Sequence, residues 1–269
     1  MAKYTFGFIG TGNMGGALAR AAAQKLPPER ILLANRTPEK AQALANELGC
    51  AAGDNAEVAA ESEYIFLGVK PQMMADMLLG IAPALAARTD RFVLVTMAAG
   101  LSMDQIRGMA GGDYPVLRIM PNTPAALGCG MVLISSDARV QAEEKRRFTE
   151  LLAGAGRFDE LPEHLIDAGS AVSGCGPAFF YMFIEALADG GVAAGLPRVK
   201  AQDYAAQTAL GAARMVLESG SHPGALKDAV CSPGGSTIMG VKALEDGGFR
   251  SEAINAVLAA FRRTKELGK

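Results

Sequence analysis

Short apolar runs alternate with amphipathic stretches through the first half of the chain. The runs cover residues 6–9, 31–34, 64–69, 92–96, 116–120 and 131–134, and residues 157–161 form a further candidate strand. Runs that are apolar at nearly every position are typical of parallel strands buried on both faces. Helical patterns lie between them at 38–48, 72–87, 102–109 and 138–153. This α/β alternation predicts a Rossmann-type, doubly wound parallel sheet over residues 1–160.

The pattern changes after residue 160, because only helical periodicity is found from Glu163 onward. Breaks rich in Gly and Pro at 174–177, 195–197, 219–223 and 232–235 divide this part into several helices. We therefore expect an all-helical domain over 161–269. Its helix at about 177–194 is apolar almost all round, which requires burial on every side. A terminal domain of this size rarely achieves that alone, so we expect a second subunit to cover the helix.

A glycine-rich turn follows the first apolar run. Gly10, Gly12 and Gly15 form the pattern G-x-G-x-x-G between a strand and a helix, the context in which this pattern indicates a dinucleotide site. Gly10 permits the tight turn, Gly12 lets backbone N–H groups approach a pyrophosphate, and Gly15 lets the helix pack closely on its strand. The pyrophosphate then lies at the positive end of the helix dipole. A glycine-rich turn in some other α/β domain is the alternative.

The end of the second strand indicates which dinucleotide is bound. NAD-specific sites usually place an acid about 20 residues beyond the glycines, and that spacing from Gly15 reaches Asn35, followed by Arg36 and Thr37. An arginine suits the 2′-phosphate of NADPH because its planar fork donates two parallel hydrogen bonds. Thr37 precedes a proline and resembles a helix N-cap. We expect NADPH, while Glu39 keeps NADH possible and an ordinary surface role for Arg36 stays open.

Composition and charge limit the classes of molecule that the protein is expected to bind. The formal net charge of the 269 residues is −2, so bulk electrostatics do not favour nucleic acid or an anionic membrane. We expect no signal peptide, because Met1-Ala2-Lys3 runs straight into the first strand, and no membrane span, because the most apolar stretch, residues 179–187, is interrupted by Glu185. Four widely spaced cysteines indicate reduced thiols, and the two isolated histidines do not suggest a metal site. We expect a cytoplasmic protein without a metal.

The predicted carboxyl ends of the strands carry small or amide-bearing residues, at 68–71, 97–100 and 120–123. Ligands bind at these ends in open α/β sheets, and such residues suit a flat nicotinamide. No histidine or acid stands ready there to move a hydroxyl proton. The pattern argues against a simple alcohol dehydrogenase.

Residues 231–237, Cys-Ser-Pro-Gly-Gly-Ser-Thr, form a second informative segment just before a helical pattern. Free backbone N–H groups and the helix dipole would make this loop an anion site, and Ser232, Ser236 and Thr237 add hydroxyl donors. The ligand would be a small carboxylate, although a capped turn between helices explains the composition equally well.

Specific motifs are spread over essentially the whole chain, at residues 7–14, 69–71, 122–124, 165–168, 173–178 and 188–191. The most diagnostic runs from His222-Pro223-Gly224 through Lys227-Asp228 to residues 232–238. In this set the chain resembles the pyrroline-5-carboxylate reductase family. It departs from the family pattern at Cys175, where the family usually has serine.

The resemblance implies an oxidoreductase that reduces 1-pyrroline-5-carboxylate to L-proline with NAD(P)H, the last step of proline biosynthesis. It also implies a homodimer that interlocks through the helical domain and often assembles into a homodecamer. Ser232, Ser236 and Thr237 would hold the substrate, with Thr237 as the candidate catalytic residue. The implied cofactor contacts are Ile9, Gly10, Thr11, Gly12, Asn13, Met14, Asn35, Arg36, Thr37, Asn55, Gly68, Val69, Lys70, Pro71, Met97, Ala98, Ala99 and Asn122.

Simple chemistry agrees with this resemblance, because a protonated C=N bond needs only a hydride and correct geometry. Two other functions stay open. β-Hydroxyacid dehydrogenases share the N-terminal turn and the Asn-Arg-Thr pattern but carry a catalytic lysine after a Gly-rich turn, and residues 174–181 contain none. A catalytically silent NADP-binding regulator is the second alternative, against which the complete 232–237 loop argues.

Overall fold

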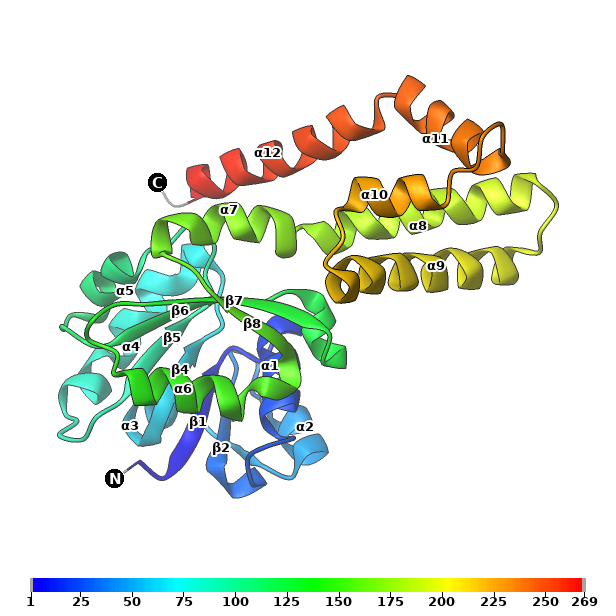
Figure 1. The fold of residues 1–269 in the computed structure, drawn as a ribbon. Coiled ribbons are helices and arrows are strands. Elements are labelled where there is room, and N and C mark those ends of the chain that lie inside the picture. Colours follow the sequence, from blue (N-terminus) through cyan, green and yellow to red (C-terminus); the bar gives the residue numbers. More distant parts are fainter. Residues whose placement is uncertain (1, 268–269) are drawn as a thin grey trace. The chain divides into compact units, whose positions relative to one another are not determined.

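An eight-stranded sheet organises the first half of the protein (Figure 1). The computed structural model describes residues 2–267. The order β3-β2-β1-β4-β5-β6-β7-β8 places the topological switch point between β1 and β4. The strands are β1 (Tyr4–Ile9), β2 (Ile31–Ala34), β3 (Ala51–Ala52), β4 (Ser62–Leu67), β5 (Val93–Thr96), β6 (Val116–Met120), β7 (Gly130–Ser136) and β8 (Gly156–Glu160).

One pair of strands departs from the predicted parallel sheet. β7 runs antiparallel to β6, whereas the other neighbouring strands are parallel. The segment that joins β6 to β7 holds only the short 3-10 turn η3 (Thr123–Leu127). A parallel return requires a longer crossover, usually a helix. The short connection therefore reverses the chain, and the expectation of a wholly parallel sheet is wrong at this pair.

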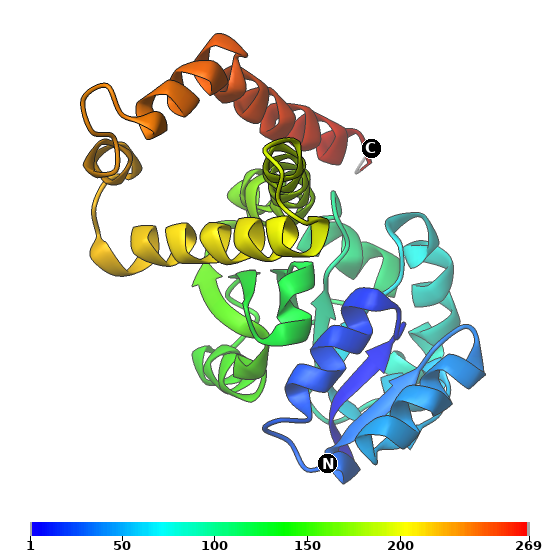
Figure 2. The same ribbon diagram turned by 90° about the vertical axis from the view of Figure 1, so that its right-hand side faces the viewer.

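Helices cover both faces of the sheet, as the uniformly apolar strands predict (Figure 2). One face packs against α1 (Asn13–Ala22), α2 (Pro38–Leu48) and α6 (Ala142–Leu151), and the other against α3 (Asn55–Glu61), α4 (Met74–Ala86) and α5 (Met103–Ala110). Phe8 and Phe66 stack in the first layer with their ring centroids 4.2 Å apart. Burial on two faces confirms the doubly wound arrangement.

The remaining helices are α7 (Glu163–Ser173), α8 (Gly176–Ala193), α9 (Arg198–Ser219), α10 (Pro223–Ala229), α11 (Ser236–Asp246) and α12 (Phe249–Leu267). The residues separate into two compact units, which we call the cofactor unit (Met1–Cys175 with Ala260–Lys269) and the helical unit (Gly176–Ala259). By its contacts, α7 belongs with the sheet. The strands end at Glu160, and a domain boundary after residue 160 stays a prediction.

The helical unit buries little by itself. Small side chains, Ala188 of α8 with Ala201 and Ala205 of α9, form its buried cluster. Large apolar side chains of α8 stay open to solvent in the single chain, with Phe180 61% and Met182 70% exposed. Exposed apolar patches of this kind mark interaction surfaces. The exposure fits the expectation that a second subunit covers α8.

One stretch of the described chain, Glu163–Ala193, is long and apolar enough to cross a membrane, with a mean hydropathy of 1.4 over its best window. The expectation that no stretch reaches that length is therefore wrong on length and composition. The apolar stretch extends through α7 as well as α8. The prediction from the sequence had covered residues 179–187 alone. α7 packs on the sheet through Ile166, which is fully buried.

We expect the exposed face of α8 to hold two copies of the chain together. A charge at Met182 would lie in an apolar interface, so Met182→Glu should shift the protein from oligomer towards monomer at micromolar concentration in sedimentation velocity. Leu79→Glu is the matched control, because Leu79 is equally exposed, at 72%, but lies on α4. Equal sedimentation of the parent and Met182→Glu would show that α8 does not form the interface.

Candidate active site

The glycine-rich turn brings three backbone segments into direct contact at the switch point. Gly10 has a φ of +98°, which side-chain-bearing residues rarely adopt. Its N–H donates to Ala34 O at 2.8 Å, and the N–H of Gly68 donates to Ile9 O at 2.7 Å. A Cβ built on Gly15 would lie 2.1 Å from Gly10 O. The predicted roles of Gly10 and Gly15, a tight turn and close packing, are confirmed.

The start of α1 is open in the way an anion requires. A Cβ built on Gly12 meets no described atom within 4 Å, so space remains beside the backbone. Gly12 is the N-cap, no described side chain caps the helix, and the first turn from Asn13 carries no acid. The N–H groups of this turn are therefore available to a pyrophosphate, and the residues fit a dinucleotide. Ile9 ends β1, and Asn13 and Met14 begin α1.

Asn35 ties the two predicted phosphate-binding segments together. Its Oδ1 accepts a hydrogen bond from Thr11 N at 3.2 Å, and its Nδ2 donates to Thr37 O at 3.1 Å. Thr37 occupies the N-cap position of α2, as predicted. Its side chain makes no capping bond within the described chain. Thr37 therefore has the predicted position but does not form the predicted hydrogen bond.

Arg36 lies exposed at the mouth of a pocket of about 440 Å³ that Asn35 and Asn55 also line. Its guanidinium lies 3.9 Å from the sulfur of Met73. Two carboxylates of this pocket, those of Asp54 and Asp76, were not predicted from the sequence. Asp54 caps α3 by accepting from Glu57 N at 2.8 Å, and the Asp-x-x-Glu spacing was the signal that could have revealed it. Arg36 therefore lies in a pocket of mixed charge.

The other predicted cofactor residues lie at the carboxyl ends of β4, β5 and β6. Lys70 is exposed in the loop after β4, beside half-buried Val69 and Pro71, and Met97 and Ala99 flank buried Ala98 after β5. Asn122, after β6, is bound within the protein. It donates to Ser173 O and accepts from Met131 N, both at 2.9 Å. Its side chain thus joins the end of α7 and the start of β7 to the segment after β6. Its position in the sequence did not indicate this role.

In the helical unit, the 232–237 loop forms a turn at the start of α11. Gly235 N donates to Ser232 O at 3.0 Å, and Gly234 has a φ of +68°. α11 begins at Ser236 with Gly235 as its N-cap, and no described side chain caps it. Thr237 is therefore the second residue of the helix rather than its cap. Ser232, Ser236 and Thr237 are all exposed in the single chain, so their hydroxyl groups are accessible.

A cation lies close to this loop in the sequence. The ammonium of Lys227 donates to Asp228 Oδ1 at 2.5 Å, and this hydrogen bond raises the pKa of Lys227 above its usual value. The backbone N–H of Cys231 donates to Asp228 O at 3.0 Å, which joins α10 to the start of the loop. The uncapped helix start favours a negatively charged ligand, whereas the charge of Lys227 is already paired with that of Asp228.

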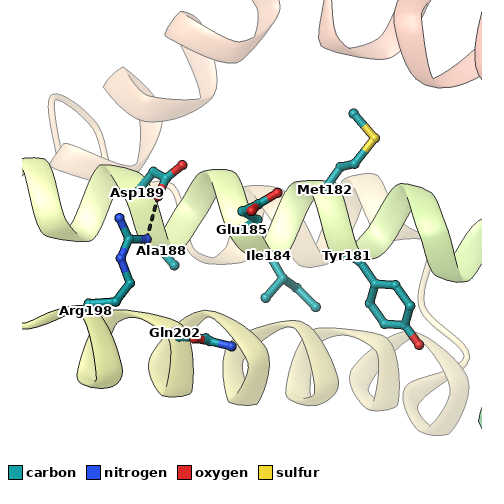
Figure 3. Close-up of a pocket in the computed structure, with 8 residues that line it drawn as sticks. All are labelled: Tyr181, Met182, Ile184, Glu185, Ala188, Asp189, Arg198 and Gln202. Carbon is teal, nitrogen blue, oxygen red and sulfur yellow. Dashed lines mark hydrogen bonds and ion pairs between the residues drawn. The ribbon is translucent and has the colours of Figure 1, made fainter.

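The helical unit has a hollow of its own between α8 and α9 (Figure 3). Ile184 and Ala188 face α9, whereas Met182 projects away from it. Arg198 binds Asp189 at 2.5 Å and closes one end. None of the sequence-predicted site residues lines this hollow. Among residues 2–267, no cluster of three or more His, Cys, Asp or Glu side chains could hold a metal ion.

The sheet topology, the glycine contacts and the open start of α1 define a Rossmann-type dinucleotide-binding oxidoreductase fold. The family models agree: residues 5–100 match the NADP oxidoreductase, coenzyme F420-dependent, model, and residues 163–267 match pyrroline-5-carboxylate reductase dimerisation. Curated relatives extend the match to the whole chain. The pyrroline-5-carboxylate reductases of Pisum sativum and Escherichia coli K12 are 42% and 40% identical, over 98% of this chain and 96% and 98% of theirs.

Solved structures give the same answer. The pyrroline carboxylate reductase of Plasmodium falciparum, with NADP bound, superposes with a TM-score of 0.89 at 32% identity and covers all of both chains. The enzyme from Coxiella burnetii has a TM-score of 0.88 at 30% identity, over 99% of both chains. The chain belongs to the pyrroline-5-carboxylate reductase family.

Arg36 gives a test of cofactor choice. Its guanidinium would pair with the 2′-phosphate that only NADPH carries, so Arg36→Ala should raise the KM for NADPH about ten-fold or more and that for NADH less than two-fold, in steady-state assays. Lys40→Ala, which removes an exposed charge four residues further on, in the first turn of α2, should change neither value. Equal effects of Arg36→Ala on the two cofactors would show that Arg36 does not bind the 2′-phosphate.

Proposed function

We propose that this chain reduces the cyclic imine 1-pyrroline-5-carboxylate to L-proline with NADPH, and that the 232–237 loop holds the imine acid. When bound, the cofactor supplies the hydride. The observation that carries the proposal is that one chain contains two helix starts without side-chain caps, those of α1 and α11. The start of α1 suits a pyrophosphate, and the start of α11 suits a carboxylate.

The cofactor's position follows from the open side of Gly12 and from the pocket beyond β2. The N–H groups at the start of α1 bind the pyrophosphate, and Thr11 and Asn35 fix the shape of the turn through their mutual hydrogen bond. Arg36 binds the 2′-phosphate, and this is the basis for preferring NADPH. Small residues after β4 and β5 leave room for the nicotinamide ring. The other cofactor contacts expected from the sequence are part of this proposal, except that the amide of Asn122 already binds Ser173 O and Met131 N.

The substrate's position follows from the start of α11. The N–H groups of Ser236 and Thr237 bind the carboxylate, with the Ser232 hydroxyl beside them. The Thr237 hydroxyl then donates a hydrogen bond to the ring nitrogen as that nitrogen becomes an amine. No acid or histidine is required, because solvent protonates the imine and the protein holds two reactants in the correct geometry. The alternatives, a hydroxyacid dehydrogenase or a silent NADP-binding regulator, leave the exposed hydroxyls of this loop unexplained.

The assembly is a homodimer in this proposal, and the helical unit supplies its interface. The support is the family model for dimerisation over residues 163–267 and the exposed apolar side chains of α8. A homodecamer is the larger assembly that the family resemblance implies. We place the enzyme in the cytoplasm, with four free cysteines as support. Nucleic acids and membranes are not among its proposed partners.

The direct test of the function is oxidation of NADPH in the presence of 1-pyrroline-5-carboxylate, followed at 340 nm. We expect turnover with the imine acid and none with simple alcohols or hydroxy acids. A protein that binds NADPH but does not oxidise it with this imine would be the silent regulator. Turnover of a 3-hydroxy acid instead would indicate a hydroxyacid dehydrogenase.

Thr237 provides a sharper test of mechanism. Loss of a hydrogen-bond donor to an atom at which charge develops costs about 10²–10³ in kcat, whereas a lost helix-capping hydroxyl costs only about 1 kcal/mol of stability. Thr237→Ala should therefore lower kcat at least 100-fold and leave NADPH affinity and Tm nearly unchanged, while Thr237→Ser keeps much of the activity. Thr149→Ala, which removes a hydroxyl from a surface helix of the cofactor unit, is the control. Turnover of Thr237→Ala within a few-fold of the parent would exclude Thr237 as the donor.

Subunit mixing tests whether one active site uses two chains. Gly12→Asp fills the open space beside the pyrophosphate with a negative charge, and Thr237→Ala removes the donor. The two inactive variants, unfolded and refolded together, should regain about a quarter of the parental activity if the cofactor of one chain meets the loop of the other. Each variant refolded alone sets the baseline. Mixtures that stay at that baseline would show that each chain contains a complete site.

A further inference from the structure

A cluster of four charged side chains in the cofactor unit has no part in the mechanism above. Its centre is Arg118 of β6, whose side chain is 3% exposed in the middle of the sheet. Arg118 Nη2 donates to Asp167 Oδ1 of α7 at 2.5 Å, and Nη1 lies 3.5 Å from Glu163 Oε1 at the start of α7. Glu163 Oε1 also accepts from Met103 N of α5 at 2.7 Å. The sheet, α5 and α7 are thereby cross-linked.

Asp167 also binds the end of the chain. Its second oxygen, Oδ2, accepts a hydrogen bond from Lys265 Nζ of α12 at 3.0 Å. The Asp167 side chain is 7% exposed, and that of Lys265 is 48% exposed. One buried carboxylate on α7 therefore binds side chains of β6 and α12, which are far apart in the sequence.

These two helices are the segments through which the chain passes between the two units. It leaves the cofactor unit after Cys175, just beyond α7, and returns at Ala260, inside α12. Asn122 fixes the C-terminal end of α7 as well, by donating to Ser173 O. Both passages are thus anchored on the cofactor unit, and Asp167 is the residue common to both anchors.

Stability alone does not account for such a cluster. Replacing a buried ion pair by well-packed apolar residues is often neutral or stabilising, so a retained pair is better explained by the arrangement it specifies. We propose that Asp167 is a positioning residue: by binding Arg118 and Lys265 together, it fixes the two passages of the chain and so the placement of the substrate loop. The inference rests on the proposed function, in which that loop and the cofactor must meet in a defined geometry. Small misplacements of reacting groups lower the rate strongly.

Lys265 offers the cleanest test, because its removal leaves the buried Asp167–Arg118 pair intact. Lys265→Met should lower kcat about ten-fold at saturating NADPH, with the Kd for NADPH, the sedimentation coefficient and the Tm near those of the parent. Lys265→Arg, which keeps the charge, should restore most of the loss. Arg263→Met is the matched control, because it removes the same charge from the same helix, and within residues 2–267 Arg263 pairs with Glu266, three residues on.

Hydrogen exchange gives a second readout that needs no substrate. The amides of residues 260–267 should exchange at least five-fold faster in Lys265→Met than in the parent or Arg263→Met, since local opening precedes exchange. A kcat of Lys265→Met within two-fold of the parent, or an equal fall in Arg263→Met, would overturn the proposal. A parent enzyme that does not reduce the imine would refute the proposed function instead, and the exchange comparison would still decide whether Lys265 anchors α12.

Discussion

The approach of backbone to backbone at Gly10, Gly15 and Gly68 is the constraint on which the rest of the structure depends. Gly68 and Gly10 each leave no room for a Cβ, because the other's carbonyl oxygen would lie 2.6 Å away. The start of α1 is therefore drawn into the crevice between β1 and β4, where the sheet changes its direction of winding. A larger side chain at any of these positions would move the helix, and the anion site at its start would move with it.

The helical unit is built differently, because its helices bury little apolar surface against one another. α8 and α9 meet through alanines, which allow close approach but remove little apolar area from water. The large side chains of α8, such as Phe180 and Met182, face outward in the single chain. A unit built in this way leaves large apolar side chains for a partner surface to cover. The cofactor unit differs, because two layers of helices cover its sheet.

Local patterns predicted the parts of the protein that depend on neighbouring residues. Uniform apolar runs marked β2 and β6 at their observed bounds, and the glycine spacing predicted the turn after β1. The antiparallel direction of β7 escaped prediction, because apolar runs carry no sign of direction and only the length of a connection does. The Thr37 side chain does not cap α2, although its position was right. The pairing of Arg118 with Asp167 joins residues that a local pattern cannot relate, yet an arginine within an apolar strand was a visible signal that some partner exists.

The chemistry explains why the charged residues lie where they do. An imine that is already protonated needs a hydride and alignment, which fits the hydroxyl and N–H groups of the 232–237 loop that we propose as the substrate site. A site of this kind gains its rate from the positions of the reacting groups. Charge is costly to bury, and a buried pair is justified where it fixes one arrangement among several of similar energy. Arg118 and Asp167 lie at such a point, where β6, α7 and α12 meet. The polar groups that govern the reaction therefore include some that never touch the substrate.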